Sequence, residues 1–204
     1  MLELENDETI IESRLKKWQD ERTFRFNRDS NKEIFSVDTP PPYVNAVLHL
    51  GHGMDYTIND AVARFQRLNG KEVIFPFGLD KNGLPIEVKV EKEYNISILN
   101  TDREKFIQLC RSLFDKYYGE NTDIVRKLGV SFNNLNFGNN VGDSYETDSE
   151  IYRSISQQIF LDLWKKGYIY EDTKIVNFCP VCHTTLADSE LEYDEKDTKD
   201  TYFE

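Results

Sequence analysis

Two histidines three positions apart are the first residues in this chain that could do chemistry. They stand in the run His49-Leu50-Gly51-His52, and this spacing would place both imidazoles on one face of a helix's first turn. That end of a helix carries free N–H groups and a partial positive charge, which suit a phosphate chain. Two imidazoles can donate to phosphoryl oxygens as charge develops, and Gly51 would let a base or sugar lie against the backbone. The run predicts a nucleotide site; the alternatives are an ordinary helix cap or a partial metal site.

A single carboxylate, Asp80, follows an apolar run of strand length, Val73–Phe77, and lies in a loop bracketed by Gly78 and Gly83. A carboxylate just past a buried strand is well placed to pair with an ammonium group, because ligands of open α/β sheets bind at the carboxyl ends of strands. The alternative is that Asp80 is a turn residue before Gly83.

The third group of residues that could do chemistry is the pair Cys179 and Cys182, separated by two residues. This spacing is half of a zinc knuckle, and a structural zinc site needs four ligands. Cys110 is far away in sequence, and His183 cannot stand in for a second pair. The pair therefore predicts at most a Zn²⁺ half-site, with inert thiols as the alternative.

Short strands that alternate with helices must position these groups. This order predicts an α/β unit with parallel strands, divided into a helical segment 1–32, an α/β domain 33–167 and an appendage 168–204. An irregular loop is expected over Phe132–Val141. Strands are predicted over Ile34–Val37 and Val73–Phe77, and helices over Glu8–Phe24, Leu50–Leu68, Leu84–Tyr94, Asp102–Leu128 and Glu146–Lys166.

The composition narrows the class of protein. Of the 204 residues 37 are acidic and 25 basic, and the net charge of −12 excludes a broad phosphate-binding surface of the kind that nucleic-acid modules use. No apolar run approaches the roughly 20 residues that span a membrane, and the acidic N-terminus is unlike a signal peptide. Three cysteines do not make a disulfide framework. We therefore expect a cytoplasmic protein without a membrane partner.

The histidine run resembles the first signature motif of the class I aminoacyl-tRNA synthetases. The resemblance covers nearly the whole chain, in the order and spacing of the valyl, isoleucyl and leucyl subgroup. The triple proline before the motif is similar to valyl enzymes, whereas Ile86–Ile96 is shared with isoleucyl enzymes. The matching segments are Val37–Tyr43, His49–His52, Asp60–Phe65, Gly70, Phe75–Asp80, Asn82–Lys92, Ser156-Gln157, Asp162–Gly167 and Cys179 to Tyr193.

The resemblance implies a Rossmann-like (HUP-type) parallel-sheet half-domain with a small zinc-ribbon-like C-terminal appendage. It implies activation of valine with ATP and Mg²⁺ to valyl-adenylate, followed by transfer to tRNA(Val). His49 and His52 would be catalytic and would bind ATP together with Leu50 and Gly51. The amino-acid site would comprise Pro41, Pro42, Tyr43, Asn45 and Asp80. The alternatives are a piece of an isoleucine–tRNA ligase and a non-catalytic paralogue that binds a nucleotide or an amino acid.

Two residues depart from the family's pattern, and three of its parts do not occur. The family has glycine where this chain has Ala46, and histidine where it has Asn82. A lysine-rich second signature, the body of the editing domain and an anticodon-binding domain are not found in the sequence. We therefore expect the first half of a catalytic domain with the start of its connective insertion, which does not charge tRNA alone. The remaining domains would lie on a longer chain or on a separate chain.

Overall fold

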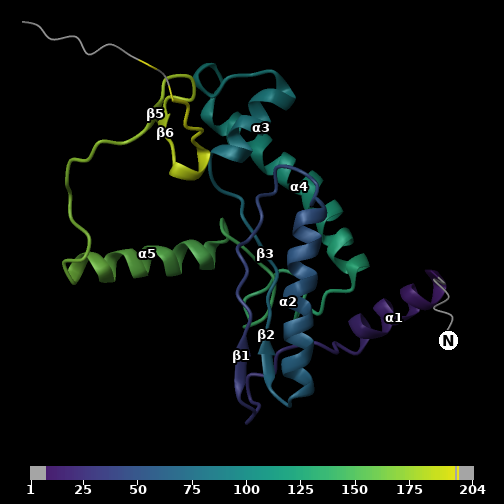
Figure 1. Ribbon diagram of the computed structural model, residues 1–204. Helices are drawn as coiled ribbons and strands as arrows, with labels where there is room; N and C mark the ends of the chain where they lie inside the picture. Colours follow the sequence, from purple (N-terminus) through teal and green to yellow (C-terminus); the bar gives the residue numbers. More distant parts are fainter. Residues whose placement is uncertain (1–7, 196, 198–204) are drawn as a thin grey trace, which may run out of the picture. The chain divides into compact units, whose positions relative to one another are not determined.

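The computed structural model describes residues 8–195 and 197, which fall into two compact units that meet between residues 158 and 159 (Figure 1). The first unit begins with α1 (Glu8–Asp20), β1 (Ile34–Ser36), α2 (Leu50–Leu68), β2 (Glu72–Ile74) and β3 (Gly78–Leu79). It continues with α3 (Leu84–Tyr94), a short 3₁₀ helix η1 (Ile98–Asn100), α4 (Arg103–Leu128) and β4 (Tyr145–Glu146). Helix α5 (Glu150–Lys165) begins in the first unit and ends in the second.

The strands of the first unit pair in parallel. Strand β1 pairs with β2, with Phe35 opposite Val73, and β3 pairs with β4, with Gly78 opposite Tyr145. Because parallel strands point the same way, the loops after their carboxyl ends lie along one edge. The predicted α/β unit with parallel strands is therefore confirmed.

The predicted strand Val73–Phe77 is wrong in its extent, although its burial is confirmed. Val73, Phe75 and Phe77 are each at most 2% exposed, but regular pairing stops at Ile74 and resumes at Gly78. Two causes lie in this stretch. Pro76 has no N–H to give to a ladder, and the side chain of Asn133 takes the place of a strand by accepting from Phe75 N and donating to Val73 O (2.9 Å).

Helix boundaries follow local backbone demands. The predicted limits of α2 and α3 are confirmed, and the Asp102 carboxylate accepts from Lys105 N (3.1 Å) to cap α4, which begins one residue later. Helix α1 ends at Asp20 instead of Phe24 because Arg22 adopts a positive φ of 51°. Helix α5 begins at Glu150 instead of Glu146 because Tyr145 and Glu146 form β4.

A partly buried ion pair joins three elements. The Asp60 carboxylate on α2 accepts from Arg64 Nε (2.7 Å) and from Ser131 N (2.7 Å) in the loop after α4. The Arg64 guanidinium also donates to Gly129 O (2.6 Å) and lies over the Trp18 ring, 5.2 Å from its centroid. Helices α1 and α2 and the end of α4 are thereby held together.

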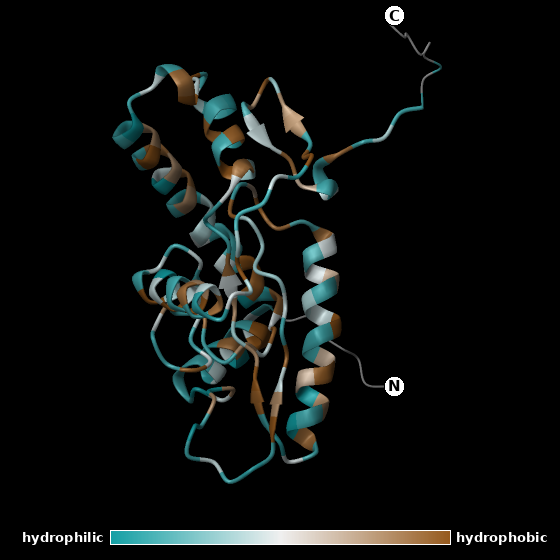
Figure 2. Ribbon diagram, turned by 90° about the vertical axis from the view of Figure 1, so that its left-hand side faces the viewer, coloured by the Kyte–Doolittle hydropathy of each residue, from teal (hydrophilic) through white to brown (hydrophobic). Residues whose placement is uncertain are grey.

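Helix α2 carries a second apolar face that the described residues do not cover. Its exposed hydrophobic residues recur every three or four positions, and Figure 2 shows brown residues recurring along this helix. They are between 43% and 90% exposed: Leu50, Met54, Ile58, Val62 and Phe65. An uncovered apolar stripe of this kind is typical of an interaction face.

The second unit contains β5 (Phe178–Cys179) and β6 (Thr184–Thr185), which pair antiparallel, and the 3₁₀ helix η2 (Asp188–Glu190). Residues 196 and 198–204 of the expected appendage lie outside the described residues, as do residues 1–7 of the expected helical segment. Over the part of the chain that the structure describes, no helix is both long and apolar enough to cross a membrane.

The Asn133 side chain gives a test of how the central strand is held. Asn133→Ala removes the partner of Phe75 N and Val73 O inside the core, so we expect a loss of about 2–4 kcal/mol in the free energy of unfolding. Urea denaturation measures it, with the exposed Asn139→Ala as control. A loss no larger than that of the control would contradict the role given to Asn133.

Candidate functional site

The predicted helix start at His49 is confirmed, and the two histidines themselves form its cap. His49 has an extended backbone (φ −95°, ψ 172°), and its Nδ1 accepts from Gly51 N at 3.1 Å. His52 Nδ1 in turn accepts from His49 N at 3.4 Å, and the ring centroids are 4.0 Å apart. This is a reciprocal capping box in which imidazoles replace the usual hydroxyl and carboxylate. The two histidines therefore cap helix α2.

The cap determines which ring nitrogens remain available. A neutral imidazole has one acceptor and one donor nitrogen, and Nδ1 is the acceptor in both rings. The proton of each neutral ring is therefore on Nε2, which points away from the hydrogen bond that Nδ1 makes. Partial burial, and next the nearby His49, lower the pKa of His52 from 6.5 against the opposing effect of Asp55. His52 is thus a neutral donor at pH 7.

Gly51 leaves the space that the His49 ring needs in the helix cap. A Cβ at this position would lie 2.9 Å from His49 Cε1 and 3.0 Å from His49 Nδ1. The absent side chain therefore makes room for the His49 ring, a reason that the sequence did not suggest. Leu50, the other residue of the run, is 90% exposed.

The backbone joins the two predicted ligand segments directly. Tyr43 and Asp80 form a parallel bridge in which Asp80 N donates to Pro42 O (2.9 Å) and Val44 N donates to Asp80 O (3.2 Å). Pro42 is buried, Pro41 and Asn45 are half-buried, and Tyr43 is exposed. The proline-ended strand and the Asp80 loop are thus neighbours at the carboxyl ends of their strands.

The loop between this bridge and the histidine cap is held by a residue that sequence reasoning missed. Asn121 on α4 is wholly buried; its Oδ1 accepts from Leu48 N (2.9 Å) and its Nδ2 donates to Ala46 O (3.1 Å). The available signal was an amide four residues before Val125, on the apolar face of a predicted helix. Asn121 fixes the path of the chain into His49.

The Asp80 carboxylate is oriented by a second residue that was missed, Thr147. Asp80 Oδ1 accepts from Thr147 Oγ1 (2.8 Å) and from Asn82 N (3.0 Å). The same hydroxyl accepts from Lys81 N (3.0 Å) and from Asn82 Nδ2 (2.9 Å), so its one donor and two acceptor positions are all used. The bond to Asn82 N closes a local turn, while the Asp80 backbone lies in the bridge to Tyr43. Within the described residues, Asp80 Oδ2 accepts no hydrogen bond and is left for a ligand.

Side chains of the Asp80 loop and of β4 lie close to one another. Lys81 Nζ lies 2.9 Å from Glu146 Oε2 and 3.9 Å from the centroid of the Phe114 ring. Tyr145 stacks parallel to Tyr152, with centroids 5.9 Å apart. Burial raises the pKa of the Tyr145 hydroxyl, and Tyr152, Asp38 and Asp80 add to the shift. Tyr145 is therefore an uncharged hydroxyl close to two carboxylates.

The cysteine pair lies in the second unit. Cys179 Sγ accepts from Cys182 N (3.4 Å), and backbone hydrogen bonds from Cys182 and Val181 lower the pKa of the Cys179 thiol. Over residues 8–195 and 197, no group of three or more histidine, cysteine or acidic side chains could hold a metal ion. Two thiols do not make up the four ligands of a structural zinc site.

The family of tRNA synthetases class I (I, L, M and V) matches residues 13–202. The chain belongs to this family. Among solved structures, the LeuRS of Agrobacterium radiobacter, in a ternary complex with tRNA and LeuAMS, is similar with a TM-score of 0.70 and 27% identity. That likeness covers 88% of this chain and 20% of LeuRS.

Curated relatives of this class I synthetase chain include valine–tRNA ligases. That of Pyrobaculum aerophilum is 42% identical over 188 residues, which are 92% of this chain and 22% of the relative. That of Methanocaldococcus jannaschii is 37% identical over 203 residues, 98% of this chain and 22% of the relative. The chain thus spans about a fifth of the length of the relatives that it matches.

The His52 pKa predicts a pH dependence of stability. Since the folded-state pKa lies below 6.5, both states are neutral above that pH, and the unfolded chain takes up the proton first as the pH falls. Stability is therefore lost from pH 6.5 downward through the folded pKa. His52→Gln keeps an acceptor at the N3 position of the capping box but does not titrate. We expect a smaller fall in Tm from pH 7 to 5 in this variant, and equal falls would contradict the assignment.

The Thr147 hydroxyl predicts a matched pair of variants. Thr147→Val keeps the shape of the side chain but leaves Lys81 N and the Asn82 amide without their acceptor, so we expect a loss of about 1–3 kcal/mol. Thr147→Ser keeps the hydroxyl and should lose less than half of that. Chemical denaturation measures both, and equal losses would show that only packing matters.

Proposed function

We propose that this chain forms the first half of the adenylate-forming site of a valine–tRNA ligase. The observation that carries the proposal is the bridge between Tyr43 and Asp80, beside a helix start capped by two histidines. The overall reaction would be valine plus ATP to valyl-adenylate and pyrophosphate, followed by transfer of valine to tRNA(Val). The family match covers the isoleucyl and valyl enzymes alike, and the valine–tRNA ligases among the relatives support the choice of valine over isoleucine.

His49 and His52 would act on the ATP phosphates, with Mg²⁺ bound to the nucleotide. The hydrogen bonds to Nδ1 leave Nε2–H of both rings as preorganised donors, and donors that meet developing charge lower a barrier without reorganisation. Leu50 and Gly51 would contribute the helix start, whose N–H groups suit phosphate oxygens. His52, whose pKa is lowered by burial, would be a donor in its neutral form.

Asp80 would hold the ammonium group of the amino acid through Oδ2, while Oδ1 stays with Thr147 and Asn82. Pro41, Pro42, Tyr43 and Asn45 would border the side chain of the substrate. A pocket of this kind rejects larger side chains by shape, whereas one methylene is worth only about 1–3 kcal/mol. A valine pocket would therefore reject the larger isoleucine strongly. A pocket that fits isoleucine would reject the smaller valine only weakly.

The two departures from the family's pattern are accommodated locally. The Asn82 amide donates to Thr147 Oγ1 (2.9 Å), so it supports the carboxylate network from the position of the family's histidine. Ala46 is exposed, and its carbonyl is held by Asn121. These contacts favour a competent amino-acid site over a non-catalytic paralogue, which is the alternative function.

The division into 1–32, 33–167 and 168–204 is part of the proposal, as is a partner that carries the rest of the enzyme. The uncovered stripe on α2 and the outer edge of β1 offer further polypeptide a helix face and a strand edge. The relatives' greater length makes that polypeptide the remainder of a synthetase, on this chain or on another.

A zinc-ribbon-like role for the β5–β6 hairpin would need ligands beyond Cys179 and Cys182. No step of the proposed reaction depends on zinc. Elemental analysis of the purified chain tests the role, and one zinc per chain that survives dialysis would support it.

Asp80→Asn tests the amino-acid site. Asparagine retains an Oδ1 for Thr147 and Asn82, so we expect Tm to change little. Loss of the charge-assisted hydrogen bond should weaken binding of a valyl-adenylate analogue by about 10–100-fold. Isothermal titration measures the affinity, with the exposed Asp115→Asn on α4 as the control of equal charge. Unchanged affinity would reduce Asp80 to a turn residue.

The 204-residue chain alone should not charge tRNA. The two histidines would supply hydrogen-bond donors on one side of the ATP phosphates, and the lysine-rich second signature that would supply the other side is not found in the sequence. Loss of a single donor of this kind typically costs about 10²–10³ in rate. Incubation with tRNA, ATP and labelled valine should give no product above background, while ATP–pyrophosphate exchange separates weak adenylate formation from none. Salt-resistant charging by this chain would contradict the proposal.

A further inference from the structure

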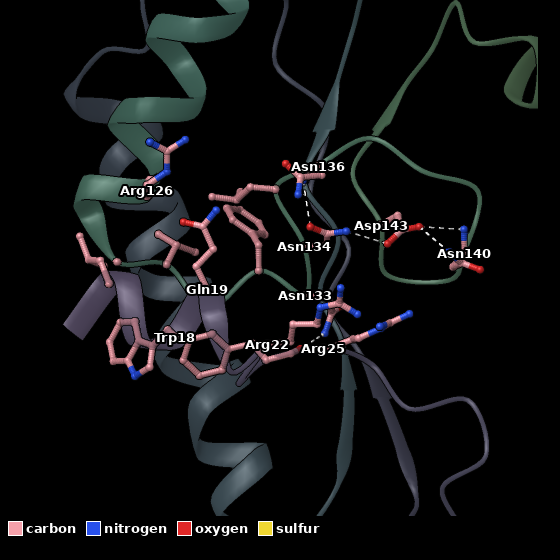
Figure 3. A pocket seen from close by; sticks show the side chains of 16 residues that line it. Trp18, Gln19, Arg22, Arg25, Arg126, Asn133, Asn134, Asn136, Asn140 and Asp143 are labelled. Carbon is pink, nitrogen blue, oxygen red and sulfur yellow. Dashed lines mark hydrogen bonds between the residues drawn. The ribbon is translucent and has the colours of Figure 1, made fainter. Parts of the chain in front are cut away.

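A polar cavity of about 320 Å³ is lined by none of the residues of the proposed adenylate site. It is bordered by the end of α1, by the last turn of α4 and by the loop between α4 and β4 (Figure 3). Arg22, Arg25 and Arg126 line it together with several side-chain amides. Figure 3 shows Arg22 and Arg25 near each other on one rim, with Asn134 and Asn136 across from them.

Arg22 occupies a backbone position that normally belongs to glycine. Thr23 N donates to Trp18 O (3.0 Å) and Arg22 N donates to Gln19 O (3.2 Å), which is the Schellman ending of a helix with Arg22 at the left-handed position. Helices α2 and α5 end with the same pair of bonds, and there Gly70 and Gly167 hold that position. An arginine at this site costs backbone energy, which marks Arg22 as a candidate for a functional role.

The positive charge at the cavity is available for a ligand. Of its three arginines, only Arg126 forms an ion pair within the described residues, with Asp123 (3.1 Å). The one carboxylate of the cavity, Asp143, accepts from Asn134 Nδ2 (2.9 Å) and from Asn140 N and Nδ2 (3.0 and 2.9 Å). Arg25 forms no ion pair with Asp143, although, against the opposing effect of burial, its charge helps these hydrogen bonds to lower the pKa of Asp143. Arg22 and Arg25 also line an adjoining hollow, together with Arg28 and the acidic residues Glu21, Asp29 and Asp143. The two arginines therefore lie between the two hollows and can be reached from either.

Residues 14–32, which contribute Arg22 and Arg25 to the cavity, carry a net positive charge, opposite to that of the whole chain. Residues 14–32 contain seven basic and three acidic side chains, whereas the chain carries −12. A local cationic site on an acidic protein selects for an anion at one place instead of attracting polyanions everywhere. The cavity is larger than one phosphate group needs, and the side-chain amides of Gln19 and Asn136 can both donate and accept.

We propose that this cavity binds a phosphodiester of single-stranded RNA, with Arg22 and Arg25 on the phosphate and side-chain amides on the ribose 2′-hydroxyl. Guanidinium groups suit phosphate oxygens in a bidentate manner, and the 2′-hydroxyl is both donor and acceptor, as an amide lining requires. The choice of RNA as the polyanion rests on the proposed function. The cavity would be a contact for the nucleic-acid substrate that is separate from the adenylate site.

The test is binding of a fluorescently labelled twelve-nucleotide RNA to the 204-residue chain, followed by anisotropy over a series of salt concentrations. For single strands the logarithm of affinity falls with the logarithm of salt by about 0.7 per phosphate neutralised. We expect Arg22→Gly and Arg25→Gln each to weaken binding and to lower that slope by about 0.7. Arg22→Gly should at the same time keep or raise Tm, because glycine relieves the positive φ.

The matched control is Arg111→Gln, which changes the charge equally on the same helix as Arg126 but about 22 Å away along its axis. Equal weakening in this control, or unchanged binding in both cavity variants, would overturn the proposal. Competition by tripolyphosphate as effective as that by unlabelled RNA would assign the cavity to small phosphates instead, and equal competition by DNA of the same sequence would remove the role of the 2′-hydroxyl. The proposed function is tested separately, because both cavity variants should bind the valyl-adenylate analogue as the unaltered chain does.

Discussion

The site depends above all on one short stretch of parallel backbone pairing. Asp80 N and Asp80 O bond to the residues on either side of Tyr43, at 2.9 and 3.2 Å. This bridge lies past the regular part of β1, after three prolines that cannot continue a ladder. The bridge fixes the distance between the segment that leads to the histidine cap and the loop that carries the Asp80 carboxylate. The other hydrogen bonds of the site form between segments that this bridge already connects.

Side chains complete the hydrogen bonding that these short strands leave open. Regular pairing covers only two or three residues of each strand, yet the core around Phe75 and Phe77 is almost fully buried. Backbone groups in such a core must find partners, and Asn133 and Asn121 supply them from the loop after α4 and from α4 itself. The buried amides therefore do what a longer ladder would do, and they also determine where the loops go.

The side chains of the two histidines and of Asp80 also stabilise the local backbone. In each case one polar atom is used to hold the local fold and its twin is left over: Nδ1 against Nε2, and Oδ1 against Oδ2. Preorganisation of this kind costs nothing when a ligand arrives, because the side chain is already fixed. The hydrogen bonds that cap α2 and hold the Asp80 loop are therefore compatible with the ligand roles proposed for the same side chains.

The sequence alone determined the class of fold, the limits of α2 and α3, the helix start at His49 and the family. These follow from patterns local in sequence: apolar periodicity, prolines that end a strand, glycines that end helices, and a motif of fixed spacing. Only the tertiary structure decided that Val73–Phe77 is interrupted, that Glu146 belongs to a strand, and that Asn121 and Thr147 hold the site. Thr147 is 67 residues from Asp80, and Asn121 is 73 from Leu48. Contacts over such separations depend on how the elements pack, which no local pattern encodes.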